Sequence, residues 1–489
     1  MKTYTELHGG LGRAINFRPT RYRVTELLRD HPPRLSVNGQ DTQLHDVAMS
    51  GISFIVPPTT TFEIGDKLQI VLSIGADKAF EGAGEVVRVE KSPGRFRIGV
   101  SLPHDFIDVP GLLDRHESIA LSEALSGGAD ALRGAVPAEY REVVERAVLF
   151  VQHTRDVLDR NEARLRSRGL PEQRVLELAG DAARSLQPTW TSISRAAARA
   201  LAPHLHDRRT TDACRRYTRL VLTSLLTDAP GIQRAVEKPL GYPGDYETMN
   251  YIYRDELEGG SAFAKVFHKF GVDEPLAAGA RTRKELIKGV MREEHLRALA
   301  SRGPEATFDV LGLGCGPAVE VEEYIREWKA WAGSVRWTLV DQEEAALSIA
   351  YAGAYRALTQ TNCSGQVRCF YLSFQHMIQE PKLLGATSNH DLIYAAGFFD
   401  YLPQKVARKL VSDLVDRLAP DGVLLIGNAI GPNDHFWFAE HILDWPLIYR
   451  TKEDMEDLAA PVADRATGEI TKDSLGVYHV LVLRRHVDR

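Results

Sequence analysis

The chain has 489 residues, of which 44% are hydrophobic and 26% charged. This length is enough for about three domains. With 60 Lys and Arg against 66 Asp and Glu, the formal net charge is −6, which argues against a nucleic-acid partner held mainly through its phosphates. We therefore expect a globular, acidic protein that binds no nucleic acid.

The four cysteines form no CxxC pair and no spacing typical of a zinc site. We expect no metal, no disulfide scaffold, and a reducing compartment, the cytoplasm. The N-terminus lacks the apolar core of a signal peptide, and no run of about 18 apolar residues predicts a membrane span. The oligomeric state stays open, with a homodimer among the alternatives.

Residues 1–110 contain short apolar runs separated by turn signals. Asn38-Gly39 is typical of a hairpin turn, and Leu68, Ile70 and Leu72 alternate with polar neighbours. About five or six such strands in about 80 residues predict a small closed or nearly closed β-barrel.

Residues 111–302 change to a helical period. Apolar residues recur at spacings of three and four from Tyr140 to Leu158, and similar stripes follow. No fixed repeat is visible, which disfavours a solenoid. We expect a helical connector or cap, a pattern that by itself indicates no chemistry.

Residues 303–489 alternate between strands and helices. Apolar strands are predicted at residues 308–313, 335–340, 367–372, 391–394, 422–427 and 478–483, with helical segments between most of them. This alternation predicts an α/β domain with a parallel, doubly wound sheet.

The turn after the first of these strands carries three glycines, Gly312, Gly314 and Gly316. Without Cβ atoms the backbone can turn sharply and approach a ligand, and the next helix N-terminus can receive a polar group. Pro317 stands where a GxGxxG fingerprint requires glycine, so NAD or FAD fits less well. Asp341, at the end of the second strand, is placed to accept both hydroxyls of a ribose. The alternative is a tight turn with a surface aspartate.

On these residues the segment 308–483 resembles the class I S-adenosylmethionine-dependent methyltransferases. The resemblance implies a Rossmann-like methyltransferase domain with S-adenosylmethionine as cofactor. It implies cofactor contacts from Gly312, Gly314, Gly316, Asp341, Gln342, Ser373, Phe374, Ala396 and Gly397. The chain departs from the family at Gly312, where many members have an acid that helps to hold the methionyl amine.

Three further motifs, at residues 238–251, 398–402 and 444–450, resemble the 3-hydroxypalmitic acid methyl ester biosynthesis proteins. The resemblance implies a small, lipid-like carboxylic acid as methyl acceptor. It places substrate contacts at Tyr242, Asp245, Asn250, Phe398, Trp445 and Arg450, and Arg281 is a further candidate because an arginine can pair with a carboxylate. The loop with Tyr242 would then cover the cofactor crevice and exclude water, or else form a helix-capping turn packed by tyrosines. Arg281-Thr-Arg283 would pair with a carboxylate or form a solvated helix end.

Methyl transfer to a carboxylate needs alignment but no general base, because the acceptor is already ionised near neutral pH. For an acceptor of high pKa the candidate catalytic residues are Asp400, Tyr401, Tyr246 and His376. Asp400 can instead cap the helix that begins near Pro403. The aromatic segment 436–445 is interpreted either as the floor of an apolar acceptor site or as core.

The N-terminal barrel resembles a PilZ domain over about residues 18–106, through Asp46-Val-Ala-Met-Ser-Gly51 and residues 95–102. The resemblance implies cyclic di-GMP binding by Arg18, Arg21, Arg23, Asp46 and Gly51. Arginines suit this ligand because they clamp phosphates and stack on guanines. Ala48 replaces the serine of DxSxxG and no RxxxR spacing is present, so a degenerate barrel used for protein contacts is the alternative.

The sequence therefore supports two functions. The first is a methyltransferase acting on a lipid-like acid and regulated by cyclic di-GMP through the PilZ-like domain. The second is a non-catalytic, cyclic di-GMP-responsive signalling or scaffold protein whose methyltransferase-like domain no longer turns over.

Overall fold

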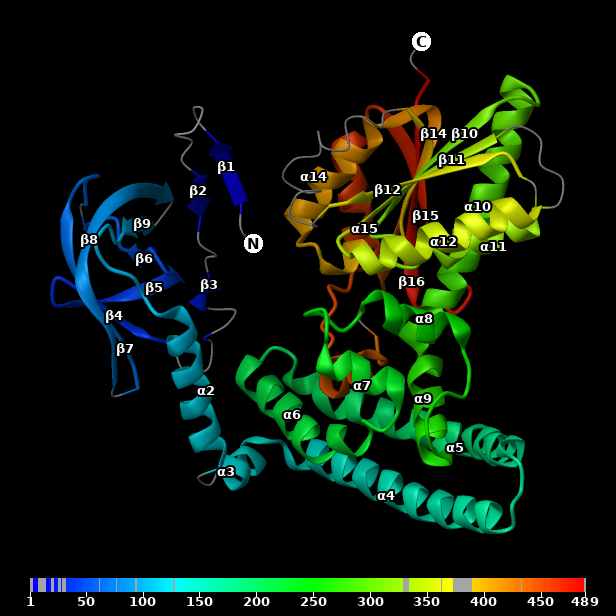
Figure 1. Ribbon diagram of the computed structural model, residues 1–489, viewed down its shortest axis with the longest axis horizontal. Helices are drawn as coiled ribbons and strands as arrows, with labels where there is room; N and C mark the ends of the chain where they lie inside the picture. Colours follow the sequence, from blue (N-terminus) through cyan, green and yellow to red (C-terminus); the bar gives the residue numbers. More distant parts are fainter. Residues whose placement is uncertain are drawn as a thin grey trace. The chain divides into compact units, whose positions relative to one another are not determined.

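The computed structural model describes residues 3–7, 15–18, 22–24, 28, 32–60, 62–75, 77–92, 95–125, 128–328, 334–361, 363–372, 389–431 and 433–487. The chain forms two compact units, Met1–Arg133 and Gly134–Arg489 (Figure 1). The three-part division of the sequence at residues 110 and 302 stays a prediction.

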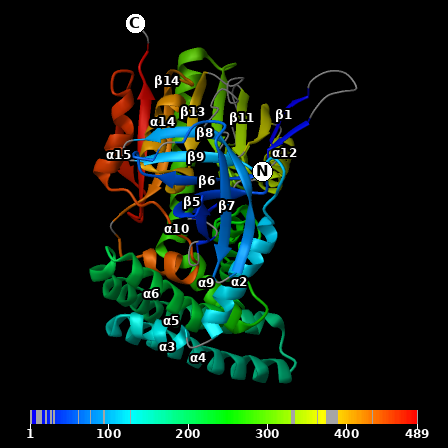
Figure 2. The same cartoon turned by 90° about the vertical axis from the view of Figure 1, so that its left-hand side faces the viewer.

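The first unit contains the predicted β-barrel (Figure 2). Its strands are β3 (Tyr22–Arg23), β4 (Arg34–Val37), β5 (Gln40–Ala48), β6 (Gly51–Val56), β7 (Lys67–Ile74), β8 (Asp77–Ser92) and β9 (Arg95–Ser101). They follow the order β3-β5-β4-β7-β8-β9-β6, and the additional pairing of β5 with β6 closes the barrel. Strands β1 (Thr3–Leu7) and β2 (Ile15–Arg18) pair separately, and helices α2 (Val109–Leu125) and α3 (Gly128–Ala135) follow.

Local sequence explains the barrel. Asn38 and Gly39 both have positive φ, as the predicted hairpin turn between β4 and β5 requires. Leu68, Ile70 and Leu72 are buried on one side of β7, so the period-two pattern does mark the interior. A Cβ at Gly51 would collide with the Val100 carbonyl. The close approach of β6 and β9 therefore requires glycine at position 51.

The second unit begins with helices. They are α4 (Ala138–Ser167), α5 (Glu172–Leu201), α6 (Arg208–Val221), α7 (Pro230–Glu237), α8 (Tyr246–Arg254), α9 (Ala262–Asp273) and α10 (Pro275–Arg302). Trp190 of α5 is fully buried and lies against Phe267, Phe270 and Trp437. Because Trp437 comes from the α/β part, these aromatic contacts join the helices to the sheet region.

The α/β part has a seven-stranded sheet with the order β12-β11-β10-β13-β14-β16-β15. The strands are β10 (Thr307–Leu313), β11 (Ser334–Asp341), β12 (Gly365–Tyr371), β13 (His390–Ala395), β14 (Leu418–Ala429), β15 (Ala466–Lys472) and β16 (Tyr478–Arg485). The first five are parallel, in the 3-2-1-4-5 order of doubly wound sheets. The prediction of a parallel sheet is wrong for β16, which pairs antiparallel with β14 and with the unpredicted β15.

Helices cover both faces of this sheet (Figure 1). One buried cluster contains residues of α14 (Gln404–Val415) and α15 (Lys452–Ala459). The other contains residues of α10, α11 (Val319–Glu327) and α12 (Glu344–Thr361). In this order the strand sequence reverses between β10 and β13, and such a switch point opens a crevice at the carboxyl ends of the strands.

Candidate functional site

A cavity of about 170 Å³ lies in the second unit between the carboxyl ends of the strands and helices α7 to α10. Its wall includes Gly314, Gly316 and Asp341 at one end and apolar side chains of the helices at the other. The predicted cofactor crevice and the helical region therefore share one enclosed space.

The glycine turn after β10 is open to this cavity. Gly314 and Gly316 have φ values of 58° and 54°, in the left-handed region that favours glycine. A Cβ built on Gly316 would meet no atom within 4 Å, so the backbone there presents bare surface to a ligand. Desolvation raises the pKa of the half-buried Cys315 thiol well above the ordinary value, which disfavours the thiolate that a nucleophilic role requires.

Asp341 connects the end of β11 to the glycine turn. Its Oδ2 accepts a 2.8 Å hydrogen bond from the Gly316 N–H, and its Oδ1 accepts one of 3.0 Å from the Glu343 N–H. Burial raises the pKa of Asp341, against the lowering effect of these hydrogen bonds. A carboxylate has about four acceptor sites, so Asp341 keeps capacity for two further donors from a ligand.

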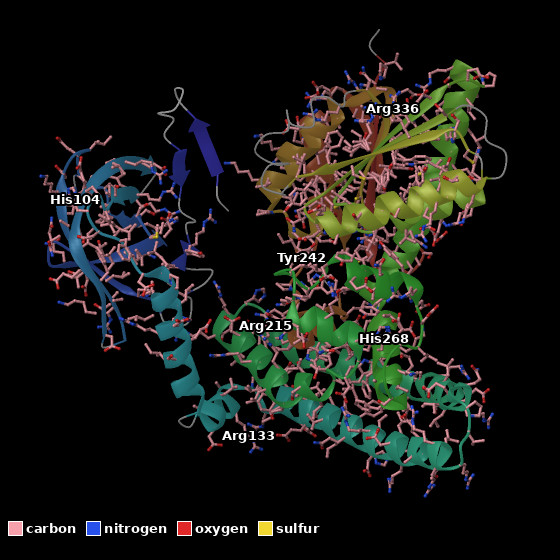
Figure 3. The ribbon with its side chains drawn as sticks, in the orientation of Figure 1. His104, Arg133, Arg215, Tyr242, His268 and Arg336 are labelled. Atoms are coloured by element: carbon pink, nitrogen blue, oxygen red, sulfur yellow. The ribbon has the colours of Figure 1, made fainter. Side chains whose placement is uncertain are left out.

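The loop with Tyr242 also reaches the cavity. Tyr242, Gly244 and Tyr246 line it, and Tyr242 lies near Gln342, the residue next to Asp341. In Figure 3 Tyr242 lies toward the sheet, and His268 of α9 lies among the helices. The loop therefore forms part of the cavity wall, and its role as a cover over the crevice stays a prediction.

Asp245 in the same loop does not line the cavity, and its substrate contact stays a prediction. Its carboxylate caps α8 by accepting from the Glu247 and Thr248 N–H groups, and it pairs with Arg234 at 2.8 Å. For this residue the alternative interpretation, a helix-capping turn, is correct.

Three more predicted substrate contacts lie outside the cavity wall. Asn250 donates to Glu247, and Arg281 donates to the carbonyls of Ile252 and Val272. Arg450 is 1% exposed and donates to the carbonyls of Phe399 and Leu402 and to Asn428. These side chains hydrogen-bond other groups of the protein, and their substrate contacts stay predictions.

Trp445, Tyr401 and Phe398 do line the cavity, as do Ala396 and Gly397. The Trp445 Nε1 donates a 2.9 Å hydrogen bond to the Tyr401 hydroxyl. A Cβ at Gly244 would collide with the Trp445 ring, so this glycine allows the loop to pack on the indole. The segment 436–445 contributes both to core, through Trp437, and to the cavity wall, through Phe438 and Leu443.

The buried arginine of the site is Arg283 of α10, not Arg281. Arg283 is 5% exposed, lines the cavity beside Gly397, and stacks its guanidinium on Tyr478. Its Nε and Nη1 have no hydrogen-bond partner among the described residues. Gly279, Ala280 and Ile287 are buried on the same helix at spacings of three and four from Arg283, so they form an apolar stripe with it. A charged residue on such a stripe is the sequence signal that could have identified Arg283.

Asp400 lies beside Arg283 in the wall. Its Oδ2 is 3.6 Å from the Arg283 Nη1, too long for a hydrogen bond, and its Oδ1 accepts from the Ala429 N–H at 2.8 Å. Burial raises the pKa of Asp400 to about 6. The alternative role of Asp400 as a helix cap is wrong, because Pro403 occupies the cap position of α14.

The far end of the cavity is apolar with neutral polar groups. Ile232, Met249 and Leu443 line it. His268, 1% exposed, accepts the Gly231 N–H on its Nδ1 at 3.2 Å, and burial lowers its pKa to about 4. Burial also raises the pKa of Glu274 to about 8. Burial therefore disfavours the charged form of both side chains.

Some predicted residues lie outside the described ones: Ser373, Phe374, His376 and Arg21, and the side chain of Arg18. In the barrel, Arg23 of β3 lies directly opposite Asp46 of β5 in the antiparallel strand pairing. Asp46 is 5% exposed. Within the described ranges no helix is long and apolar enough to cross a membrane. The same ranges contain no group of three or more His, Cys, Asp or Glu side chains that could hold a metal ion.

Residues 16–110 match the family model of the PilZ domain. No curated protein matches the sequence. The solved structures that are similar to this chain include the following three. A candidate exported protein from Bordetella parapertussis has 15% identity and a TM-score of 0.39, with 52% of this chain and 86% of that chain covered. The magnesium protoporphyrin IX methyltransferase from Synechocystis, with S-adenosylhomocysteine bound, has 12% identity and a TM-score of 0.33, with coverage of 52% and 99%. The N-methyltransferase NodS from Bradyrhizobium japonicum has 17% identity and a TM-score of 0.28, with coverage of 40% and 86%. Because these TM-scores are low, we draw no functional conclusion from them.

Proposed function

We propose that the second unit is an S-adenosylmethionine-dependent methyltransferase that acts on a small, lipid-like carboxylic acid. The observation that carries the proposal is the single cavity that joins the glycine turn and Asp341 to the buried Arg283 and to apolar walls. One end of the cavity suits the nucleoside part of the cofactor, and the other end suits an amphipathic acid. The methyl donor and the methyl acceptor would therefore meet in one cavity.

The residues at the strand ends fit the cofactor. The open backbone at Gly316 leaves room for a ligand, and the spare acceptor capacity of Asp341 suits the two ribose hydroxyls. When bound, the cofactor supplies a methyl group on a positively charged sulfur. The chain's own task is alignment and exclusion of water.

Arg283 would hold the acceptor. Asp400 supplies a counter-charge at 3.6 Å, but the Arg283 Nε and Nη1 have no hydrogen-bond acceptor among the described residues. A carboxylate can take two parallel hydrogen bonds from such a guanidinium. The position of Arg283 beside Gly397 would place the carboxylate of the acceptor at the centre of the cavity. The hydrocarbon chain of the acceptor would then lie along Ile232 and Met249. The Trp445–Tyr401 pair and the Tyr242 loop would exclude water.

The test is methyl transfer by the full-length protein. Labelled S-adenosylmethionine is incubated with a series of straight-chain fatty acids, and the products are separated and identified by mass spectrometry. We expect a methyl ester. If the protein binds S-adenosylmethionine but forms no ester with any acid, the non-catalytic signalling or scaffold function is favoured instead.

Asp400→Asn is expected to retain methyl transfer, with a kcat within about tenfold of the wild type, since an ionised acceptor needs no general base. Loss of the Asp400 charge should lower the acceptor KM, because the anionic acceptor no longer meets a nearby carboxylate. Steady-state kinetics at neutral pH measure both values. A general base would show a kcat loss of about 100-fold or more, which would contradict this assignment.

We further propose that the first unit binds cyclic di-GMP and regulates the enzyme. The match of residues 16–110 to the PilZ domain supports this, together with Asp46 and Gly51 on neighbouring strands. Calorimetric titration of the full-length protein should show binding that Asp46→Ala weakens, with GMP as the ligand control. No heat at high micromolar cyclic di-GMP would contradict the proposal.

A further inference from the structure

The structure explains why the chain has no acid at position 312. Gly312 lies directly opposite Tyr394 in the pairing of β10 with β13. A Cβ on Gly312 would lie 2.7 Å from the Tyr394 hydroxyl oxygen and 2.8 Å from the ring carbon that carries it. The phenol therefore occupies the space that any side chain at position 312 would need.

The Tyr394 hydroxyl leads directly to a different acid. It donates a 2.7 Å hydrogen bond to Oε1 of Glu320, in the first turn of α11. Glu320 is 5% exposed and lines the same cavity as Gly314 and Gly316. Through this hydrogen bond, a buried carboxylate lies close to the space that an acid at position 312 would fill.

Glu320 lacks a cationic partner. Among the described residues no Lys, Arg or His nitrogen lies within 4.0 Å of its carboxylate. The nearby Lys284 is held by Glu323, at 2.5 and 2.6 Å from the two carboxylate oxygens. Burial raises the pKa of Glu320. A buried carboxylate with one side-chain donor is costly, and a cation in the cavity would complete its environment.

We infer that Glu320, positioned by Tyr394, binds the α-ammonium group of the cofactor's amino-acid portion. The inference rests on the proposed methyltransferase function. With the ribose at Asp341, a cofactor lying along the glycine turn would bring its amino-acid end past Gly314 to the start of α11. Tyr394 is a positioning residue: its hydroxyl fixes one carboxylate oxygen and leaves the other oxygen to the ligand.

The test compares S-adenosylhomocysteine with its desamino analogue, which keeps the carboxylate but lacks the amine. Calorimetry on the full-length wild type should show about 10- to 100-fold tighter binding of S-adenosylhomocysteine, the range for a hydrogen bond between charged groups. Glu320→Gln keeps the size of the side chain and should abolish this preference by weakening only the amine-bearing ligand. Tyr394→Phe should reduce the preference by a smaller factor.

The wild-type comparison requires no variant, so a folding defect cannot decide it. Equal affinity of the two ligands in the wild type overturns the inference, and so does a preference that survives in Glu320→Gln. If the preference is present and depends on Glu320 while no methyl ester forms with any acid, the inference stands and the proposed enzymatic function fails.

Discussion

Replacing Asp341 with alanine is expected to lower the affinity for S-adenosylhomocysteine by at least about 100-fold, since two hydrogen bonds to a charged group are lost. Asp341 has a second role, because its Oδ2 receives the Gly316 N–H and its Oδ1 the Glu343 N–H. The substitution would remove the proposed ribose contacts and also loosen the glycine turn. Isothermal titration of the full-length protein measures the change.

Two further variants separate these roles. Asp341→Asn keeps one acceptor oxygen and the size of the side chain, so we expect an intermediate loss. Asp309→Ala is the matched control, because Asp309 is an acid on β10 that pairs with Arg336 at 2.6 Å and does not line the cavity. It should leave the affinity unchanged. Equal affinity in the wild type and in Asp341→Ala would remove the proposed ribose contact.

The part of the site that could be predicted from the sequence depends on short-range spacing. Gly314, Gly316 and Asp341 could be placed together because a glycine turn and the end of the next parallel strand are neighbours in a doubly wound sheet. The barrel could be predicted for a similar reason, since period-two runs and Asn38-Gly39 act within a few residues.

The other part depends on helix packing, which spacing does not reveal. The apolar stripe of α10 is the only local signal that separates Arg283 from Arg281, and the fold is needed to show that Arg283 lies beside Gly397 and Asp400 in the cavity wall. Glu320 could not be assigned either, because its partner Tyr394 lies 74 residues away. Asp245 and Arg450 are polar residues in motifs, and the fold gives each of them backbone groups to hydrogen-bond, which the sequence did not indicate.

The antiparallel direction of β16 was missed for a topological reason. The apolar pattern of a strand does not depend on the direction in which the strand runs. The preceding strand β15 exposes most of its residues, so no apolar run marked it in the sequence. Asp473 accepts the N–H groups of Val477 and Tyr478 and thereby fixes the tight connection between β15 and β16. A connection this short cannot contain the crossover that a parallel strand requires.

Removal of the Arg283 charge is expected to raise the KM for the fatty acid about 100-fold while the affinity for S-adenosylhomocysteine stays the same. The reason is that a bidentate pair with the acceptor carboxylate contributes two charged hydrogen bonds. Arg283→Met alone would leave Asp400 buried without its counter-charge, which destabilises a protein by about 3–5 kcal/mol. The informative comparison is therefore Arg283→Met/Asp400→Asn against Asp400→Asn.

The matched control is Arg281→Met, two residues away on the same helix. Arg281 bonds the carbonyls of Ile252 and Val272 outside the cavity, so its loss should reduce thermal stability but leave the acceptor KM unchanged. If the double variant instead loses affinity for S-adenosylhomocysteine with an unchanged acceptor KM, the guanidinium holds the cofactor's own carboxylate. The cavity would then select its acceptor by apolar contacts with side chains such as Ile232 and Met249 alone.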